Sequence, residues 1–450
     1  MSRPVIHSDI LLKLIRSGSL QRAEKVLDRM HPVDIAPLFS ELRPAEARQL
    51  LDLLFSQRRA GKTLSELPAE LVPQFLELVD DERLAQVLTR VPPDDGLVFL
   101  ESLDEERRLR VLSLMGESRS RQDLERLLRY PPGTAGNVMT PHFLAIPATA
   151  TAQEAIDAVR TRGEQVEAIF YLYVVDEIGR LNGVVPIRRL VTAPAERTVD
   201  KLMLSEPIVV QATANQEEVA RLVSRYNLLA LPVVDEFRKL LGIITVDDVI
   251  DVIQEEATQD MYRMAGLAEE DRVFSPMTTS VKKRLPWMSI NLGTAFMAAA
   301  VVGFFEDTIS QMVVLAAFMP VVAGMGGNMG TQTLTVITRG IALGEFEFAK
   351  AANVVVRNMA VGLTVGGVTG ALTGLVAWLW KGDPRLGLVL FLAMMTNLSI
   401  AGLVGAIVPV LLKRFNQDPA LGGSVITTTF TDVCGFMAFL GIARWVFGLH

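Results

Sequence analysis

The sequence predicts a multidomain membrane protein in which an acidic soluble part precedes an all-α membrane part of five helices. Three observations predict this fold class. Residues 1–280 hold 33 of the 44 Lys and Arg and 44 of the 51 Asp and Glu, a net charge of −11, whereas residues 281–450 carry a net charge of +4. Only the later part contains apolar stretches of about 20 residues, the length that crosses a bilayer. One of these stretches encloses a lone carboxylate, Asp432.

The composition of the soluble part excludes some classes of function. Its acidic balance argues against nucleic acid as a partner, because phosphate binding needs a basic surface. A single cysteine excludes an intrachain disulfide and fits a reducing, cytosolic compartment. The first residues lack the charged-then-apolar layout of a signal peptide. We therefore expect the later membrane segments to direct insertion and to leave the soluble part in the cytosol.

Residues 1–130 are predicted to form an acidic, solenoid-like helical domain. A proline followed by an acidic residue is a helix start signal, and here it recurs ahead of Phe39, Phe75 and Phe99. These phenylalanines are 36 and 24 residues apart. Such spacing is typical of stacked short helices.

A duplication follows between residues 131 and 258. Val174-Val175-Asp176-Glu177 recurs as Val233-Val234-Asp235-Glu236, and Gly183-Val184-Val185 recurs as Gly242-Ile243-Ile244, both at an offset of 59 residues. Short β-branched runs alternate with amphipathic stretches, which predicts two small α/β units over 131–200 and 201–258. No Walker, Rossmann or nucleophile-elbow motif occurs, so the sequence does not indicate an enzyme.

The membrane part, residues 285–450, contains five apolar segments: 285–305, 310–340, 351–379, 386–412 and 420–447. The second is longer than a bilayer requires and carries Gly324, Gly326, Gly327 and Gly330. Because glycine is a poor helix former, we expect a kinked or broken helix there.

The orientation of the spans follows from the distribution of Lys and Arg. These residues gather at one set of segment ends, at Lys282, Lys283, Arg284, Arg339, Lys350, Lys413 and Arg414. The positive-inside rule places those ends in the cytosol. Five spans then leave the N-terminus inside the cell and Leu449-His450 outside.

Asp432 is the residue that most strongly indicates a function. A carboxylate within hydrocarbon is costly, and such groups usually face a bundle interior or a water-filled path. No Lys, Arg or His lies within about two helical turns of it, which excludes an ion pair within the segment. The sequence therefore favours a ligand in a cation pathway. The alternative is a protonated or hydrogen-bonded structural aspartate.

The glycine-rich stretch 321–333 is the second indication of a pathway. Glycines would let backbone carbonyls face a lumen, and Asn328, Gln332 and several threonines add neutral oxygens. The alternative is close helix packing of the Gly-xxx-Gly type through Gly326 and Gly330. Beside Asp432 the stretch favours a polar lining.

Oxygen donors suit magnesium, calcium or manganese, and no histidine lies in a span, so a largely hydrated Mg²⁺ fits this donor set.

The duplicated unit resembles a CBS-domain pair, through Met139-Thr140-Pro141, the Val-Val-Asp-Glu runs and 242–248. With 326–332 and Thr431-Asp432 in the membrane part, the whole chain resembles the MgtE family of magnesium channels. The resemblance implies a homodimer in membrane lipid with its pore on the two-fold axis. It also implies a connecting helix over 259–284 that acts as a plug.

The resemblance assigns site residues by position. The pore residues would be Asp432, Asn328, Gly324 and Thr428. The regulatory magnesium ligands would be Asp94, Asp248, Asp251, Glu256, Asp260 and Asp418. Acids found in the family are replaced by Val98, Asn227 and Gln259, which implies fewer regulatory ions or a response at a different concentration. Family members can bind ATP in the first CBS unit, but Pro186 and Arg189 replace the expected hydroxyl and acid, so no nucleotide-binding residue is assigned.

Charge gives an independent reason to expect gating. Acidic domains repel one another, and divalent cations that bridge carboxylates would draw them together and favour one packing. We therefore expect a Mg²⁺ importer that closes when internal Mg²⁺ is plentiful. The alternatives are a broader Mg, Mn and Co transporter, a CBS-regulated anion channel, an intramembrane metalloprotease and a regulator without transport. The anion channel needs a positive path, and the protease needs a zinc motif that is absent.

Overall fold

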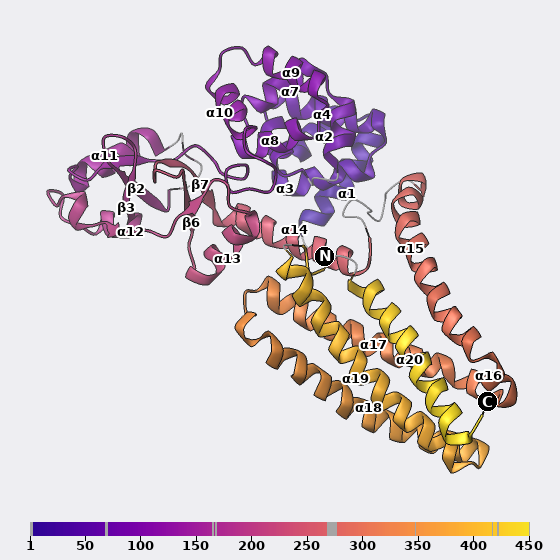
Figure 1. The fold of residues 1–450 in the computed structure, drawn as a ribbon. Helices are drawn as coiled ribbons and strands as arrows, with labels where there is room; N and C mark the ends of the chain where they lie inside the picture. The colour runs from indigo at the N-terminus through magenta and orange to yellow at the C-terminus, as the bar shows by residue number, and fades with distance from the viewer. Residues whose placement is uncertain are drawn as a thin grey trace. The chain divides into compact units, whose positions relative to one another are not determined.

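The computed structural model describes residues 3–67, 71–163, 166, 169–267, 277–346, 348–415, 417–420 and 423–449. The chain divides into two compact units, Met1–Ile253 and Gln254–His450. Figure 1 shows the helices and strands in chain order. The first unit contains the helical domain and the duplicated α/β pair, and the second contains the membrane helices.

The described part of the N-terminal domain contains ten short α-helices. They are α1 (Arg3–Arg16), α2 (Leu20–Leu27), α3 (Pro32–Ile35), α4 (Pro44–Ser56), α5 (Ala60–Ser65), α6 (Val72–Leu78), α7 (Asp81–Leu88), α8 (Pro93–Glu101), α9 (Glu105–Leu114) and α10 (Arg119–Leu127). Proline occupies one of the first two positions of α3, α4, α6 and α8. The missing N–H of proline costs nothing there, which is why these residues start helices.

The repeated phenylalanines form a ladder through the core of this domain. Phe39 and Phe75 pack edge to face at 6.4 Å between ring centroids, and Phe75 and Phe99 do so at 5.8 Å. All three are buried. Each repeat thus places its aromatic ring against the next, which confirms the predicted stack of short helices.

Two small sheets follow, each with helices. The first contains β1 (Ala145–Pro147), α11 (Ala152–Arg162), β2 (Tyr171–Val175), β3 (Leu181–Pro186), α12 (Ile187–Val191) and β4 (Leu204–Ser205). The second contains β5 (Val210–Gln211), α13 (Gln216–Tyr226), β6 (Ala230–Val234) and β7 (Leu240–Thr245). Their strand orders are β1-β2-β3-β4 and β5-β6-β7.

The two sheets repeat one another in register. Val174 pairs with Gly183 next to an irregularity in the β2–β3 ladder, and Val233 pairs with Gly242 next to an equivalent one between β6 and β7. A parallel pair opens each sheet and an antiparallel pair follows. The duplication read from the sequence is therefore a structural duplication.

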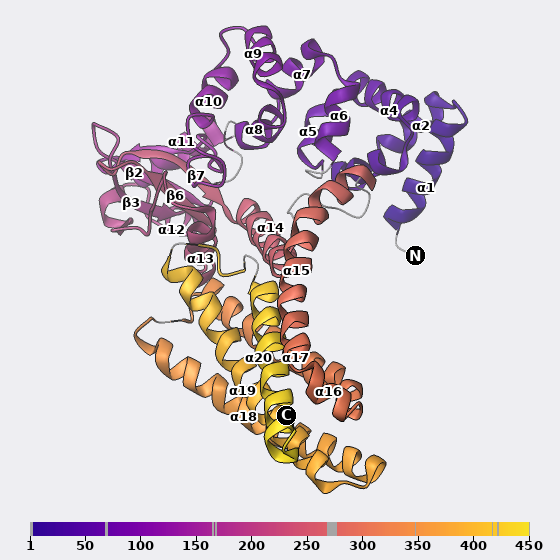
Figure 2. The same ribbon diagram turned by 45° about the vertical axis from the view of Figure 1, so that its right-hand side comes forward.

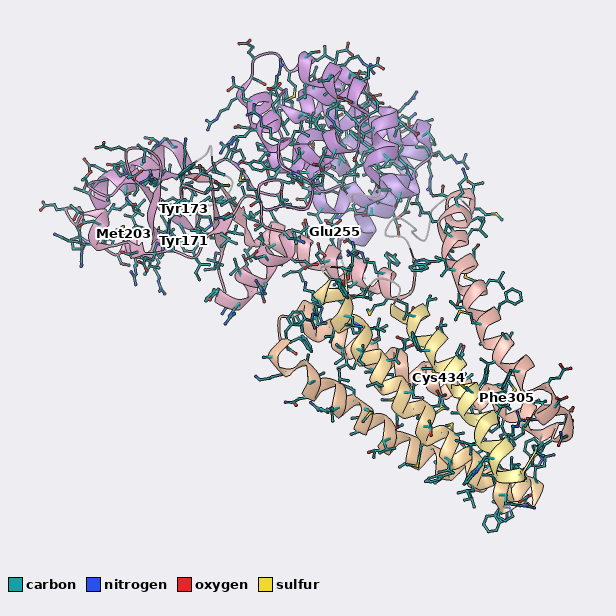
Figure 3. All side chains as sticks on the ribbon, in the orientation of Figure 1. Tyr171, Tyr173, Met203, Glu255, Phe305 and Cys434 are labelled. Atoms are coloured by element: carbon teal, nitrogen blue, oxygen red, sulfur yellow. The ribbon has the colours of Figure 1, made fainter. Side chains whose placement is uncertain are left out.

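Each of the two α/β repeats pairs with a segment that lies near the start of the other repeat. Thr140, ahead of the first unit, bridges to Ile243 of β7, and Leu204 pairs with Val184 of β3. A side chain on Gly183 would overlap Met203, labelled in Figure 3, and one on Gly242 would overlap Met139. Glycine is required at both places because the borrowed segment passes so close. This exchange of segments joins the two α/β repeats to each other.

Helix α14 (Val246–Met264) begins directly after β7 and carries most of the predicted acidic residues. The expected connecting helix over 259–284 is divided between elements. Its first residues belong to the end of α14, and its last residues belong to α15 (Met277–Phe304). Residues 268–276 lie outside the described residues.

Among the described residues, five helices are long and apolar enough to cross a membrane. They are α15, α17 (Val314–Ala342), α18 (Ala351–Lys381, with a short 3-10 turn at Phe348–Lys350 before it), α19 (Pro384–Arg414) and α20 (Gly423–Phe447). A short helix, α16 (Glu306–Gln311), joins α15 to α17. Figure 2 shows α17, α18, α19 and α20 side by side, as in Figure 1.

The break expected in the glycine-rich segment is wrong. Helix α17 runs without interruption through Pro320 and all four glycines. Gly326 and Gly330 are buried, and a side chain on either would overlap Asn397 or Thr427 of a neighbouring helix. In a bilayer no water competes for the backbone, and small residues let helices approach closely. Gly326 and Gly330 therefore serve packing within a continuous helix.

Helix α19 forms the centre of the membrane bundle. Half of its apolar window is buried, more than for any other described span. Helix α18 lies along it through Gly362, Gly366, Gly370 and Gly374, where added side chains would meet the α19 backbone. Helices α17 and α20 pack on α19 as well. The bundle is thus built around one rigid helix.

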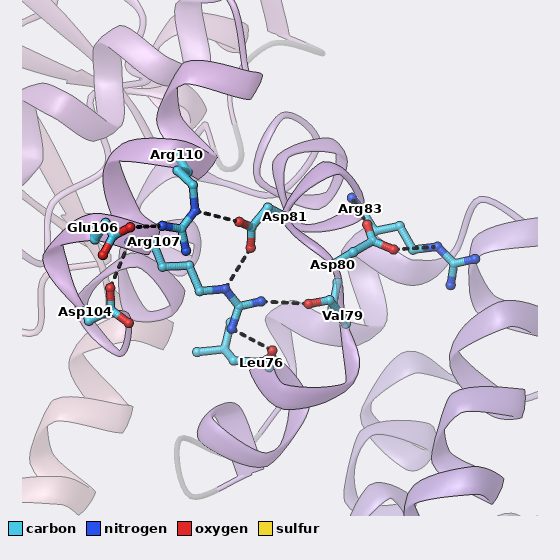
Figure 4. A network of polar contacts seen from close by, with 9 residues as sticks. All are labelled: Leu76, Val79, Asp80, Asp81, Arg83, Asp104, Glu106, Arg107 and Arg110. Carbon is cyan, nitrogen blue, oxygen red and sulfur yellow. Dashed lines mark hydrogen bonds and ion pairs between the residues drawn. The ribbon is translucent and has the colours of Figure 1, made fainter.

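In the N-terminal domain, Arg107 of α9 ties α9 to the end of α6 and the start of α7. Its guanidinium donates to Asp81 at 2.7 Å and to the carbonyls of Leu76 at 2.9 Å and Val79 at 2.7 Å (Figure 4). The hydrogen bond from Arg107 to the Asp81 carboxylate is the main reason that the pKa of Asp81 lies below its usual value. Arg110 also contacts Asp81, at 3.3 Å, but its side chain is half exposed.

We expect Arg107→Met to destabilise the helical domain by about 2–3 kcal/mol, because two carbonyls and a carboxylate lose their donor. Arg110→Met is the matched control and should cost less than about 1 kcal/mol, as an exposed pair does. Hydrogen exchange of the α7 and α9 amides in the full-length protein measures both changes. Equal effects of the two substitutions would contradict this assignment.

The same pair predicts a pH dependence. The folded pKa of Asp81 is lower than the unfolded value near 3.8, so its pairing with Arg107 stabilises the fold fully above that value. The contribution is lost as pH falls through the folded pKa. The stability difference between wild type and Arg107→Met should therefore be constant from pH 7 to pH 5 and shrink below about pH 4. Thermal melts at these pH values test it.

Candidate functional site

The predicted pore residues lie on two adjacent helices, α17 and α20. A side chain on Gly327 would reach Thr428 at 3.7 Å, and one on Gly330 would overlap Thr427. Thr427 and Thr431 are buried, one helical turn apart, on the face of α20 that packs into the bundle. Glycine on one helix and threonine on the other thus bring the two backbones together.

Helix α17 has a polar stripe opposite its packing face. The stripe consists of exposed residues that share one side of the helix, Gly324, Asn328, Thr331, Gln332 and Thr335. Thr331 and Thr335 donate to carbonyls of their own helix. The amides of Asn328 and Gln332 make no hydrogen bond within the described part of the chain. A membrane helix thus presents polar groups that its own chain does not satisfy.

Asp432 and Thr428 lie one turn apart on α20, and both are half-buried. The Thr428 hydroxyl donates to Ser424 at 2.9 Å, which leaves its oxygen lone pairs available. The Asp432 carboxylate has no hydrogen-bond or ion-pair partner among the described residues. The chain itself therefore offers no support for a hydrogen-bonded structural aspartate. Cys434, labelled in Figure 3, follows two residues later on the same helix.

The four predicted pore residues can offer a cation only oxygen ligands. These are the Asp432 carboxylate, the Asn328 amide oxygen, the Thr428 hydroxyl and the backbone carbonyl of Gly324. Such donors suit a hard cation that keeps much of its water. Within the described residues, no three carboxylate, thiolate or imidazole groups converge to hold a metal ion by themselves.

Asn397 of α19 is a polar residue in the bundle that the sequence reasoning missed. Its side chain is fully buried, and its amide nitrogen donates to the carbonyl of Val322 on α17 at 2.8 Å. Its amide oxygen has no hydrogen-bond partner within the part of the chain that the structure describes. An uncharged polar residue in the middle of a predicted span was the signal in the sequence, the same kind of signal that identified Asp432.

The predicted regulatory residues of the first unit lie in an acidic cluster. Asp95 of α8 is the member that the sequence reasoning missed, and its pKa is raised to about 6, first by burial and then by Asp248, Glu66 and Asp251. Burial also raises the pKa of Asp248 and of Asp251, and Asp247 adds to both shifts. Asp94 stands beside Asp95 in the first turn of α8. These acids repel one another, so a positive charge placed among them would relieve the repulsion.

The predicted regulatory residues of the second unit lie in a different environment. Burial, and next Asp418 and Glu256, raise the pKa of Asp260, while Arg263 and Arg339 oppose the shift. Arg263 is ion-paired with Asp418, which also accepts the amide of Ala420 at 2.8 Å. The structure thus brings Glu256, Asp260 and Asp418 together, but with a basic side chain already among them.

The departures from the family pattern have local explanations at two positions. Asn227 ends α13 in the left-handed conformation, at φ 51°, which asparagine tolerates better than most residues. Gln259 lies between Glu255, to which it donates, and Arg263, from which it accepts. Val98 is exposed on α8, and nothing in the structure explains it.

Comparisons with known proteins agree with this architecture. Family models match at residues 319–442 (MgtE, divalent cation transporter), 30–133 (MgtE intracellular N domain), and 135–196 and 199–255 (CBS domain). The magnesium transporter MgtE of Bacillus subtilis is 32% identical over 98% of this chain and 98% of its own. That of Thermus thermophilus is 34% identical over 96% and 97%.

Two solved structures resemble the soluble part. The crystal structure of the cytosolic domain of the Mg²⁺ channel MgtE in complex with ATP is 35% identical, with a TM-score of 0.52, and covers 54% of this chain and 99% of that one. The soluble part of a magnesium transporter is 27% identical, with the same TM-score, and covers 57% and 100%. With five candidate spans and relatives that match it almost end to end, this multi-pass membrane protein belongs to the MgtE family of divalent cation transporters.

Proposed function

We propose that this chain is a Mg²⁺-selective channel that imports the ion across the cytoplasmic membrane and closes when internal Mg²⁺ is plentiful. The single observation that carries the proposal is the carboxylate of Asp432, which lies within a membrane helix and has no partner among the described residues. Two relatives named magnesium transporter support the choice of ion. The Lys and Arg distribution supports a cytosolic N-terminus and an external C-terminus in the bacterial inner membrane.

A homodimer follows from the same face. Gly324 and Asn328 of α17 are exposed, and Asp432 of α20 is half-buried, so the chain leaves polar groups uncovered at membrane depth. Lipid cannot satisfy them. A second copy related by a two-fold axis would enclose this face and bring two Asp432 carboxylates to one water-filled path. Two negative charges then face one hydrated divalent cation.

Magnesium is favoured by the character of the donors. Mg²⁺ gives up its water reluctantly, and few protein ligands with retained waters are its usual arrangement. One carboxylate per chain with amide and hydroxyl neighbours fits that arrangement. The same oxygens accept Mn²⁺ and Co²⁺, so a broader divalent cation transporter is the second candidate.

Gating would rest on the two acidic clusters. In the first unit the charges acting on Asp95 are Asp248, Glu66 and Asp251, all of them acidic, and they repel until a cation is bound. Mg²⁺ bound there favours the packing that closes the pore, and loss of Mg²⁺ releases it. ATP is not part of the proposal, because Arg189 donates to the carbonyl of Leu202, at 3.4 Å, and Pro186 caps α12 in place of a hydroxyl.

We expect Asp432→Ala to reduce Mg²⁺ uptake by proteoliposomes to the level of protein-free vesicles, because the path loses its only carboxylate. Asp307→Ala is the matched control, since it removes an exposed carboxylate from α16, outside the spans. Wild-type rates in the Asp432→Ala vesicles would refute the proposed pathway.

We expect Asp248→Ala combined with Asp251→Ala to keep the channel open at high internal Mg²⁺, because the cluster loses two ligands. The matched control is Glu177→Ala with Glu236→Ala, which removes two exposed acids from equivalent hairpins of the same pair. Patch recordings of inside-out membranes measure closure. If the ligand variant closed at the wild-type concentration, the sensor would lie elsewhere.

We expect Arg263→Gln to close the channel at about fivefold lower internal Mg²⁺, because the guanidinium competes with the ion for Asp418. Arg414→Gln is the control, as Arg414 is exposed and makes no ion pair with any described residue. The same recordings give the concentration for half closure. An unchanged or higher value for Arg263→Gln would show that the ion pair does not oppose Mg²⁺ binding.

A further inference from the structure

Asn397 lies where three membrane helices meet. It projects from α19, and its amide nitrogen donates to Val322 of α17 at 2.8 Å. A side chain on Gly326 of α17 would overlap this amide, and one on Gly435 of α20 would approach its nitrogen to 2.7 Å. Both neighbouring helices therefore carry glycine where the amide fits between them.

The contacts of Asn397 alternate with the pore residues along both helices. On α17, Val322 and Gly326 are buried at the same turns where Gly324 and Asn328 are exposed. On α20, Gly435 is buried less than one turn after Asp432. A change in the amide position would therefore rotate or displace the residues that face the proposed path.

Packing alone does not account for an asparagine at this position. The side chain is fully buried in the apolar bundle, and its amide oxygen has no hydrogen-bond partner among the described residues. A buried polar atom without a partner is costly, and a hydrophobic residue of similar size would avoid the cost. What asparagine provides is a directed bond to one carbonyl, which fixes both the spacing and the rotation of α17.

We propose that Asn397 is a positioning residue for ion selection: it holds α17 against α20 so that Asn328 and Asp432 face the same space. This inference rests on the proposed function. Asn397 does not touch the ion, and its effect passes through Val322 and the two glycines. Without the hydrogen bond, the chain would still carry Asn328 and Asp432, but the distance between their side-chain oxygens would vary. The preference for a small hydrated ion would then weaken.

The test measures uptake of Mg²⁺, Mn²⁺ and Co²⁺ by proteoliposomes over a range of concentrations. Asn397→Leu is expected to raise the half-saturating Mg²⁺ concentration at least fivefold and to lower the preference for Mg²⁺ over Mn²⁺ by a similar factor. The matched control is Asn358→Leu, because Asn358 donates only to Val354 of its own helix, at 2.9 Å. The control should stay within twofold of wild type.

A second set of variants separates the hydrogen bond from the space that the side chain fills. Gly435→Ala should disturb ion preference in the same direction, because the added methyl group displaces the amide. Combining Asn397→Ala with Gly435→Ala refills the space without the bond. We expect the pair to remain folded and still to have lost its ion preference.

Two outcomes would overturn the proposal. The first is a wild-type half-saturating Mg²⁺ concentration and wild-type ion preference in Asn397→Leu. The second is full recovery of both quantities when Asn397→Ala is combined with Gly435→Ala. A partly misfolded sample lowers only the maximal rate, because half-saturation and preference report on the molecules that still transport. If wild-type vesicles took up no Mg²⁺, the proposed function itself would fail, which is a distinct result.

Discussion

The close approach of α17 to α19 and α20 is the constraint on which the membrane part depends. In hydrocarbon there is no water to satisfy backbone groups, so the spans must be continuous helices, and their association must come from packing and a few polar contacts. Glycines at 326 and 330 remove the side chains that would keep α17 at the usual distance. Only then can Thr427 and Asn397 fill the space beside these two glycines.

This constraint divides α17 into two faces with different roles. The face with Gly326 and Gly330 packs, and the face with Gly324 and Asn328 is exposed. Helix packing and pathway lining were alternative interpretations of the glycine-rich segment, but the packing glycines and the exposed polar residues lie on opposite sides of one helix, so the first does not exclude the second. Because the helix is unbroken, its carbonyls are mostly engaged in its own hydrogen bonds. Side-chain oxygens must then supply most of the polarity along the path.

What the sequence predicted well depended on short-range patterns. Hydropathy identified the five spans to within a few residues except for α15, which begins earlier, because a bilayer sets the length of a span. The offset of 59 residues revealed the duplication, and the phenylalanine spacing revealed the helical stack, because both repeat within the chain. Asp432 stood out because its surroundings in the sequence are apolar.

What the sequence did not predict depended on contacts between distant segments. Thr140 pairs with β7 and Leu204 pairs with β3. Neither segment has a local sequence pattern that predicts this pairing. Arg263 and Asp418 are 155 residues apart. Asp95 reads as a helix-start residue until folding places it near Asp248. Asn397 was visible as a polar residue in a span, but its role needed the glycines of two other helices.

The two acidic clusters differ in a way that bears on how a cation would act at each. In the first, every charge that shifts Asp95 is negative, so a cation entering it relieves repulsion that burial has intensified. In the second, Arg263 and Arg339 already offset part of the charge around Asp260. A cation there must displace or share an existing partner, and its net gain is smaller. On this argument the first cluster would fill at lower Mg²⁺ and the second would set the upper end of the response, so one chain could sense a wider range of concentration than either cluster alone.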